Sequence, residues 1–233
     1  MALKTFADIL SRMTDLSGAV VLLSGGQDSA TCLAVALRDE VGPIYALAFD
    51  YGQRHRVELD CARELATMAG IPIRMIDMRF IAQLAPNALT DASQDILAMP
   101  GELPSTFVPG RNLFFLSVAA VMVRQWGVGK IYTGVCQTDY SGYPDCREDF
   151  VQSVQQTVRL ALDEPALEIV TPLMHLTKAQ TVLLMKDTGH LDWYAHTHTC
   201  YVGTRPACGT CPACVLRLNG FRESGITDPL AYA

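Results

Sequence analysis

The sequence lacks features that would point to a polyanionic partner or a membrane. It has no excess of positive charge, because 18 Lys and Arg stand against 24 Asp and Glu in 233 residues, a formal net charge of −6. We therefore expect no direct nucleic-acid partner and no membrane partner. The longest apolar run, 113–123, is far shorter than the roughly 20 residues that span a bilayer. Residues 1–10 carry Asp8 and do not resemble a signal peptide, so we expect a cytoplasmic protein.

The sequence also lacks internal repeats and low-complexity segments, and its pattern predicts one α/β domain. Half of the residues are hydrophobic, enough to bury a sizeable core. Short apolar runs alternate with segments of helical spacing, which is typical of a doubly wound, mostly parallel sheet. The expected strands are 18–23, 44–49, 73–76 and 130–133, and the expected helices are 30–38, 57–68, 112–126, 150–162 and 176–188.

Two regions depart from this alternation. Residues 80–110 hold four prolines, and we expect an irregular segment of the kind that often forms a lid. Residues 191–233 are rich in cysteine and predict a small C-terminal metal-binding segment, packed on an α/β domain of residues 18–190.

The string SGGQDS, residues 24–29, lies between an expected strand and an expected helix. Two glycines let the backbone approach a ligand closely, and successive N–H groups at a helix N-terminus bind anions. The hydroxyls of Ser24 and Ser29 would add donors. Asp28 is itself negative, so we expect it to cap the helix or to bind a magnesium ion. No lysine follows the glycines, so this is not a Walker A loop, and the alternative is a simple capped turn.

SGGQDS resembles the SGGxDS loop of the N-type ATP pyrophosphatases. The resemblance implies an adenine nucleotide α-hydrolase-like fold and cleavage of ATP between its α and β phosphates, which activates an oxygen of the substrate as an adenylate. It places the nucleotide on a stretch that starts in the strand and ends in the helix: Leu23, Ser24, Gly25, Gly26, Gln27, Asp28, Ser29, Ala30, Thr31, Cys32 and Leu33.

Four of the eight cysteines, Cys200, Cys208, Cys211 and Cys214, lie within one short segment. Four thiolates at this spacing predict a closed, tetrahedral Zn²⁺ site with one ion per chain. An iron–sulfur cluster is an alternative, although the usual C-x-x-x-C-P ending is missing, and disulfides would require an oxidising compartment. His196 and His198 lie nearby, but four cysteines already complete the ligand set.

Further strings narrow the resemblance to the 7-cyano-7-deazaguanine synthases of queuosine biosynthesis. They are FDYGQRH at 49–55, TFVPGRN at 106–112, DYSGYPDCR at 139–147, TPL at 171–173, THTC at 197–200 and ACGTCPAC at 207–214. Together they cover nearly the whole chain. The resemblance implies a carbon–nitrogen ligase that converts 7-carboxy-7-deazaguanine and ammonia to the 7-nitrile, through an adenylate and an amide. ATP with Mg²⁺ would be consumed, and a homodimer is implied.

Candidate site residues follow from these strings. Lys178 and Arg111 are catalytic candidates that would stabilise the charge that develops during transfer, although each cation could be an ordinary surface charge. Asp28 is the third catalytic candidate, as a partner of Mg²⁺. Asp139, Asp145 and Arg147 are candidates to bind the deazaguanine and its carboxylate, although such a loop could be a plain turn. Gln53 and His55 could line the nucleotide pocket.

Two rival functions remain open at this point. The first is an ATP pyrophosphatase that thiolates tRNA, which would also combine a phosphate loop with a cysteine-rich segment. The second is a zinc-bearing module that binds nucleotide as a regulator and cleaves nothing.

Overall fold

The computed structural model describes residues 16–53, 56–90, 93, 103–138 and 143–233. Its centre is a five-stranded sheet in the order β3-β2-β1-β4-β5, in which every pair of neighbouring strands is parallel. The strands are β1 (Ala19–Leu22), β2 (Ile44–Asp50), β3 (Ile73–Asp77), β4 (Lys130–Tyr132) and β5 (Glu168–Val170). The strand order reverses between β1 and β4, and ligands of such sheets bind at the carboxyl ends of the strands beside this reversal.

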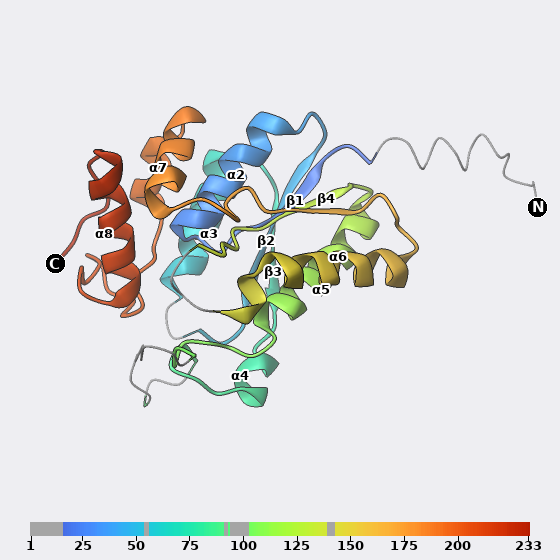
Figure 1. Ribbon diagram of the computed structural model, residues 1–233, viewed down its shortest axis with the longest axis horizontal. Helices are drawn as coiled ribbons and strands as arrows, with labels where there is room; N and C mark the ends of the chain where they lie inside the picture. Colours follow the sequence, from blue (N-terminus) through green and yellow to red (C-terminus); the bar gives the residue numbers. More distant parts are fainter. Residues whose placement is uncertain (1–15, 54–55, 91–92, 94–102, 139–142) are drawn as a thin grey trace, which may run out of the picture.

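Helices cover both faces of the sheet (Figure 1). One core joins the sheet to α2 (Gln27–Asp39) and α3 (Val57–Met68), and the other joins it to α5 (Arg111–Trp126) and α6 (Glu148–Leu162). Successive side chains of β1 point to opposite faces of the sheet: Val21 packs in the core with α2 and α3, and Val20 packs in the core with α5 and α6. On α6, Val151, Val154 and Val158 form the buried stripe expected of a helix that covers a sheet.

The C-terminal elements extend the face that carries α2 and α3. The helix α7 (Lys178–Asp187) contacts both α2 and α8 (Pro212–Ser224), and the 3₁₀ segment η2 (Leu191–His196) contacts α2, α3 and α7. In Figure 1, α7 and α8 lie side by side beyond α2. The chain then returns to the cysteine segment, where Ala233 N–H donates to the Ala207 carbonyl over 2.9 Å.

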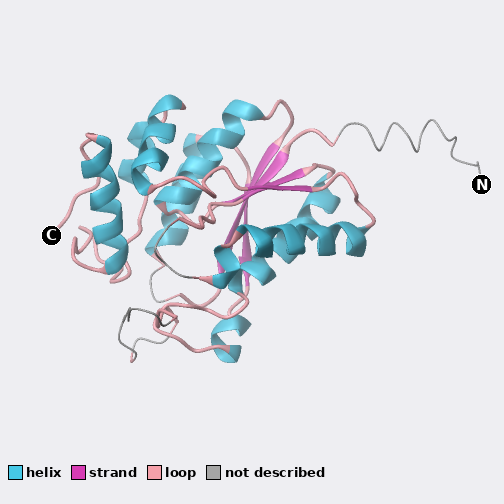
Figure 2. Ribbon diagram, viewed as in Figure 1, coloured by secondary structure: helices cyan, strands magenta, loops and turns pink. Residues whose placement is uncertain are grey.

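The predicted fold class is confirmed, and most predicted elements are present within a few residues of their expected bounds. The start of α2 was expected too late, because the phosphate loop itself supplies the first helical turn from Gln27. The sequence pattern missed β5, η2, α8 and the 3₁₀ turn η1 (Pro144–Cys146). The described part of residues 80–110 is mostly loop, as Figure 2 shows, with the short helix α4 (Phe80–Leu84) at its start.

The boundary between residues 18–190 and 191–233 stays a prediction. Among the described residues, no helix is long and apolar enough to cross a membrane.

Candidate functional site

The loop between β1 and α2 lies at the point where the strand order reverses. Gly25 has φ +87°, and a Cβ there would lie 2.0 Å from the Glu58 carbonyl oxygen, so only glycine fits. Gly26 precedes the first turn of α2 and no side chain caps that helix. The free N–H groups of the first turn therefore remain available to an anion.

The two serine hydroxyls hold the loop in this shape. Ser24 Oγ lies 3.1 Å from Ser29 Oγ and accepts from Gly26 N–H over 3.3 Å. Ser29 Oγ in turn donates to the Gly26 carbonyl over 3.0 Å. The hydroxyls thus order the loop from within, in addition to the donor role predicted for them.

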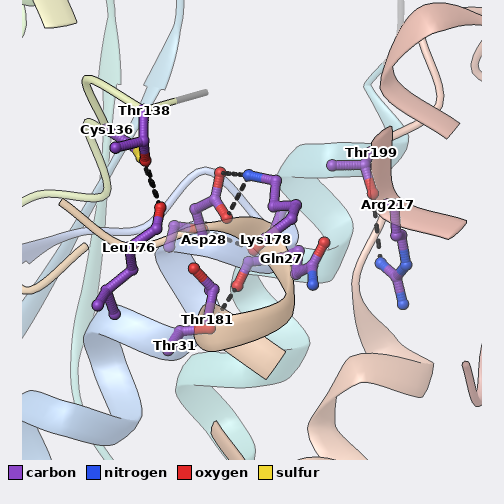
Figure 3. Close-up of polar contacts among 12 residues, drawn as sticks. Gln27, Asp28, Thr31, Cys136, Thr138, Leu176, Lys178, Thr181, Thr199 and Arg217 are labelled. Atoms are coloured by element: carbon purple, nitrogen blue, oxygen red, sulfur yellow. Dashed lines mark hydrogen bonds and ion pairs between the residues drawn. The ribbon is translucent and has the colours of Figure 1, made fainter. Parts of the chain in front are cut away.

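Asp28 does not cap α2. Its two carboxylate oxygens accept from Lys178 Nζ over 2.8 and 2.7 Å (Figure 3). Lys178 is the first residue of α7, where Thr177 and Gln180 form a capping box that fixes the start of the helix. The lysine side chain is 10% exposed and the aspartate 29%, so the pair is shielded but reachable.

Apart from Gly25, the residues predicted for the nucleotide divide into two sets. Leu23, Ser24, Gly26, Gln27, Asp28 and Ser29 line a cavity of about 630 Å³, a volume typical of small-molecule sites. Gln27 is fully buried. Ala30, Thr31, Cys32 and Leu33 lie in the helix interior without lining this cavity, and Thr31 Oγ1 is 2.7 Å from Tyr194 Oη. Burial raises the pKa of the Cys32 thiol well above its usual range.

The same cavity reaches Arg111 at the start of α5. Its guanidinium lies over the ring of Tyr51 at 5.7 Å and over that of Tyr143 at 5.9 Å. Gly110, in the left-handed region at φ 75°, turns the chain into the helix at this point. Arg111 and Lys178 therefore both line one cavity, while their role in the reaction stays a prediction.

The residues predicted to bind the substrate are not brought together in the same way. Asp145 is buried, and its Oδ2 accepts from Asn112 N–H over 3.2 Å at the start of α5. Arg147 is exposed, precedes α6 and does not line the cavity. Asp139 and His55 lie outside the described residues. Gln53 lines the cavity, but its amide is engaged by the backbone of Tyr51 and Phe49.

The four clustered cysteines fit a tetrahedral metal ion. Their sulfur atoms all lie within 4.8 Å of one another, and Cys208 Sγ is 3.9 Å from Cys214 Sγ. Four thiolates at Zn–S bonds of about 2.3 Å would be separated by about 3.8 Å. All eight cysteines lie among the described residues, and none of them forms a disulfide there. The segment is partly helical, because Cys211 directly precedes α8 and Cys214 lies in the first turn of that helix.

Comparison with known proteins agrees with this geometry. The family model described as "Queuosine biosynthesis protein QueC" matches residues 18–225. The chain belongs to this family. Proteins named 7-cyano-7-deazaguanine synthase are 50% identical in Chromobacterium violaceum, over 91% of this chain and 92% of that protein, and 50% identical in Bacillus subtilis, over 88% and 94%. The corresponding protein of Laribacter hongkongensis is 48% identical over 95% and 97%.

Among solved structures, an NMN synthetase from Francisella tularensis is similar at a TM-score of 0.49 and 18% identity, over 95% of this chain and 77% of that chain.

In this QueC family member the structure adds residues that the sequence did not single out. Glu58, Tyr143, Thr199 and Tyr201 line the cavity, and so does Arg217. The tertiary fold brings these residues together from separate parts of the chain. Tyr143 and Thr199 lie within two of the family strings, and Tyr201 and Arg217 follow such strings, which is the signal that could have pointed to them. Glu58 carries no such signal.

Arg217 joins the cysteine segment to the phosphate loop. It is 1% exposed and pairs with Asp228, 4% exposed, through Nε at 2.8 Å. Its Nη1 donates to Thr197 Oγ1 over 2.6 Å and to Thr199 Oγ1 over 3.2 Å. Between these threonines, His198 N–H donates to the Gly25 carbonyl over 2.9 Å. The buried Arg217 thus fixes the segment 197–199, which in turn contacts the phosphate loop at Gly25.

Proposed function

We propose that this chain is an ATP-dependent ligase that converts 7-carboxy-7-deazaguanine and ammonia to 7-cyano-7-deazaguanine. The observation that carries the proposal is the identity of 48 to 50% to proteins of that name, across nearly the full length of both chains. The phosphate loop, Lys178 and Arg111 in one cavity support it independently.

The chemistry requires two activations. A substrate carboxylate oxygen attacks the α-phosphorus of ATP, and pyrophosphate leaves. Ammonia attacks the resulting acyl adenylate, AMP leaves and a proton is lost, which gives the amide. The amide oxygen then attacks the α-phosphorus of a second ATP and pyrophosphate leaves, after which loss of AMP and of the nitrogen's two protons gives the nitrile.

The phosphate loop, Lys178 and Arg111 suit the step in which ATP is cleaved and pyrophosphate leaves. The N–H groups and hydroxyls of residues 24–29 would bind the leaving pyrophosphate, whose negative charge suits a helix N-terminus. Lys178 would exchange its Asp28 partner for a phosphate oxygen, and Arg111 would stabilise charge at the acyl end of the cavity. Asp28, once released, would hold Mg²⁺, which offsets phosphate charge.

The metal at the cysteines has a structural role in this proposal. Zn²⁺ suits four thiolates with no open position, and such a site contributes folding energy and leaves no sulfur free to react. We further propose a cytoplasmic homodimer that takes free ammonia, with no nucleic-acid partner. The net charge of −6 favours small-molecule substrates over tRNA.

Pyrophosphate release tests the function. Purified protein with ATP, Mg²⁺, an ammonium salt and 7-carboxy-7-deazaguanine should release two pyrophosphates per nitrile formed, with the products identified by mass spectrometry. Glutamine should not replace ammonium. ATP that binds but is never cleaved under these conditions would contradict the proposal.

A matched pair of lysine variants on α7 sharpens the test. Lys178→Ala should lower kcat by about 100-fold or more, because a charge aimed at the transferring phosphate is removed. Lys186→Ala, an exposed position on the same helix, should stay within about twofold of wild type. Equal activities of the two variants would remove Lys178 from the mechanism.

A further inference from the structure

One part of the cavity is walled by aromatic rings and holds one charge of each sign. The side chains of Tyr51, Phe115, Tyr143 and Tyr201 line it, and we call this region the aromatic box. Phe115 is held by Phe49, which stacks on it at 4.2 Å, and Tyr143 Oη lies 2.5 Å from Thr106 Oγ1. Flat, fixed rings of this kind form a slot for a planar heterocycle.

Glu58 of α3 faces this box and is unsatisfied. It lines the cavity and is partly buried, yet no hydrogen bond or ion pair joins its carboxylate to another of the described residues. Burial raises the pKa of Glu58 to about 7, and the Arg111 guanidinium offsets only part of that effect. A partly buried carboxylate that receives no hydrogen bond from the described residues is less favourable than a fully solvated one, and a ligand that brings N–H groups would relieve this.

The box is also placed beside the phosphate loop. The Glu58 backbone carbonyl is the atom that a Cβ on Gly25 would strike, so α3 and the loop are in direct contact. A ring bound in the box would therefore lie next to the phosphates of a nucleotide bound at residues 24–29. Two ligands that must react with each other need this arrangement.

We propose that the aromatic box binds the deazapurine ring of the substrate, with the Glu58 carboxylate accepting hydrogen bonds from its N1–H and 2-amino group. This inference rests on the proposed function and names the residue that reads the ring. Two adjacent N–H donors match two carboxylate oxygens, and such charge-assisted pairs are among the stronger hydrogen bonds.

The adenine of ATP is a poorer occupant of the box. Its Watson–Crick edge presents one donor, the 6-amino group, beside an acceptor, N1. An ionised Glu58 would meet that acceptor with a like partial charge, whereas the N1–H and 2-amino group of the guanine-like ring present two adjacent donors, with the 6-oxo acceptor to one side of them. The carboxylate therefore favours the guanine-like ring over adenine.

Calorimetry on wild-type protein tests the inference without any substitution. The probes are 7-carboxy-7-deazaguanine and 7-carboxy-7-deazahypoxanthine, which lacks only the 2-amino group. The second should bind about tenfold or more weakly, because one carboxylate oxygen loses its donor. At pH 7, binding of the first should release about half a proton per site, measured in buffers of different ionisation enthalpy, because Glu58 becomes fully ionised in the complex.

A variant and its matched control give the second test. Glu58→Gln should raise the KM for 7-carboxy-7-deazaguanine about tenfold or more, leave the KM for ATP within about twofold, and abolish the proton release. Asp60→Asn, an exposed carboxylate on the same helix, should behave as wild type.

The outcomes separate the inference from the proposed function. If wild type turns over 7-carboxy-7-deazaguanine but binds both probes equally, the function stands and the inference is wrong. A Glu58→Gln defect confined to the KM for ATP would likewise overturn it, by placing adenine in the box. If 7-carboxy-7-deazaguanine neither binds nor reacts, the proposed function itself fails, and the inference fails with it.

Discussion

At the scale of single residues, Glu58 is held in an unfavourable state by the fold. Its pKa is raised by burial from about 4.5 in the unfolded chain to about 7. The folded chain thus binds this proton more tightly than the unfolded chain does, so this group's contribution to stability falls as the pH rises from about 4.5 to about 7. Binding sites commonly retain such penalties because the ligand relieves them.

Replacing this carboxyl group should therefore stabilise the protein in a pH-dependent way. We expect Glu58→Gln to melt at a higher temperature than wild type at pH 8, with the difference shrinking as the pH falls toward 4, where the wild-type carboxyl is protonated in both states. Thermal unfolding followed by circular dichroism measures this, with Asp60→Asn as the control. A pH-independent difference would show that Glu58 is solvated like an ordinary surface acid.

At the scale of elements, the sequence pattern found what depends on local chemistry. The strands β1 and β2 could be predicted because a strand that is buried on both faces requires a continuous apolar run. The glycine-rich loop could be predicted because a positive φ strongly favours glycine. The strand β5 was missed because Glu168–Val170 is too short for any periodicity. The helix α8 was missed because its first turn carries Pro212 and Cys214, whose spacing pointed to a metal site instead.

The site residues likewise include some that local sequence predicts and some that only the tertiary structure reveals. Residues 24–29 and the four cysteines could be predicted because each set is contiguous and its spacing has a chemical reason. Glu58 and Arg217 could not, because their roles come from what packs against them. Arg217 is a basic residue in the sequence and is buried in the structure, where Asp228, two threonine hydroxyls and the Tyr194 carbonyl accept its hydrogen bonds.

The packing of α8 on α7 is a further element-scale feature with a testable consequence. A Cβ at Gly220 would lie 2.7 Å from Lys178 Cβ and 3.0 Å from its backbone carbon. Gly to Ala in a helix interior normally stabilises by about 1 kcal/mol. Here we expect Gly220→Ala to destabilise by about 1–3 kcal/mol, because the clash must push the two helices apart.

Urea unfolding measures this difference. Glu223→Ala, at an exposed position of the same helix, should stay within about 0.5 kcal/mol of wild type. Since α7 carries Lys178 at its first position, Gly220→Ala should also lower kcat. A variant that is more stable than wild type would show that the helices separate freely.

At the scale of the whole molecule, the cysteine cluster and the phosphate loop form one connected unit. A metal ion would join Cys200 to Cys214 in α8, and Cys200 directly follows the segment 197–199, which contacts Gly25. Arg217 of α8 makes a second connection, because it donates hydrogen bonds to Thr197 and Thr199 of that segment. A metal at the cysteines would therefore stabilise both α8 and, through the segment 197–199, the loop at residues 24–29. Loss of the metal should destabilise both.

Metal removal tests this coupling. Elemental analysis should find about one zinc per chain, and stripping it with a chelator should lower the melting temperature by several degrees or more, since structural zinc supplies folding energy. The stripped protein should also lose the stabilisation that ATP gives to the native protein, because the strand against Gly25 is no longer fixed. Zn²⁺ added back should restore both properties, and Mg²⁺ neither. A stripped protein that melts lower yet is stabilised by ATP as before would show that the cluster supports α8 alone, and that the loop at residues 24–29 keeps its shape through the Ser24 and Ser29 hydroxyls.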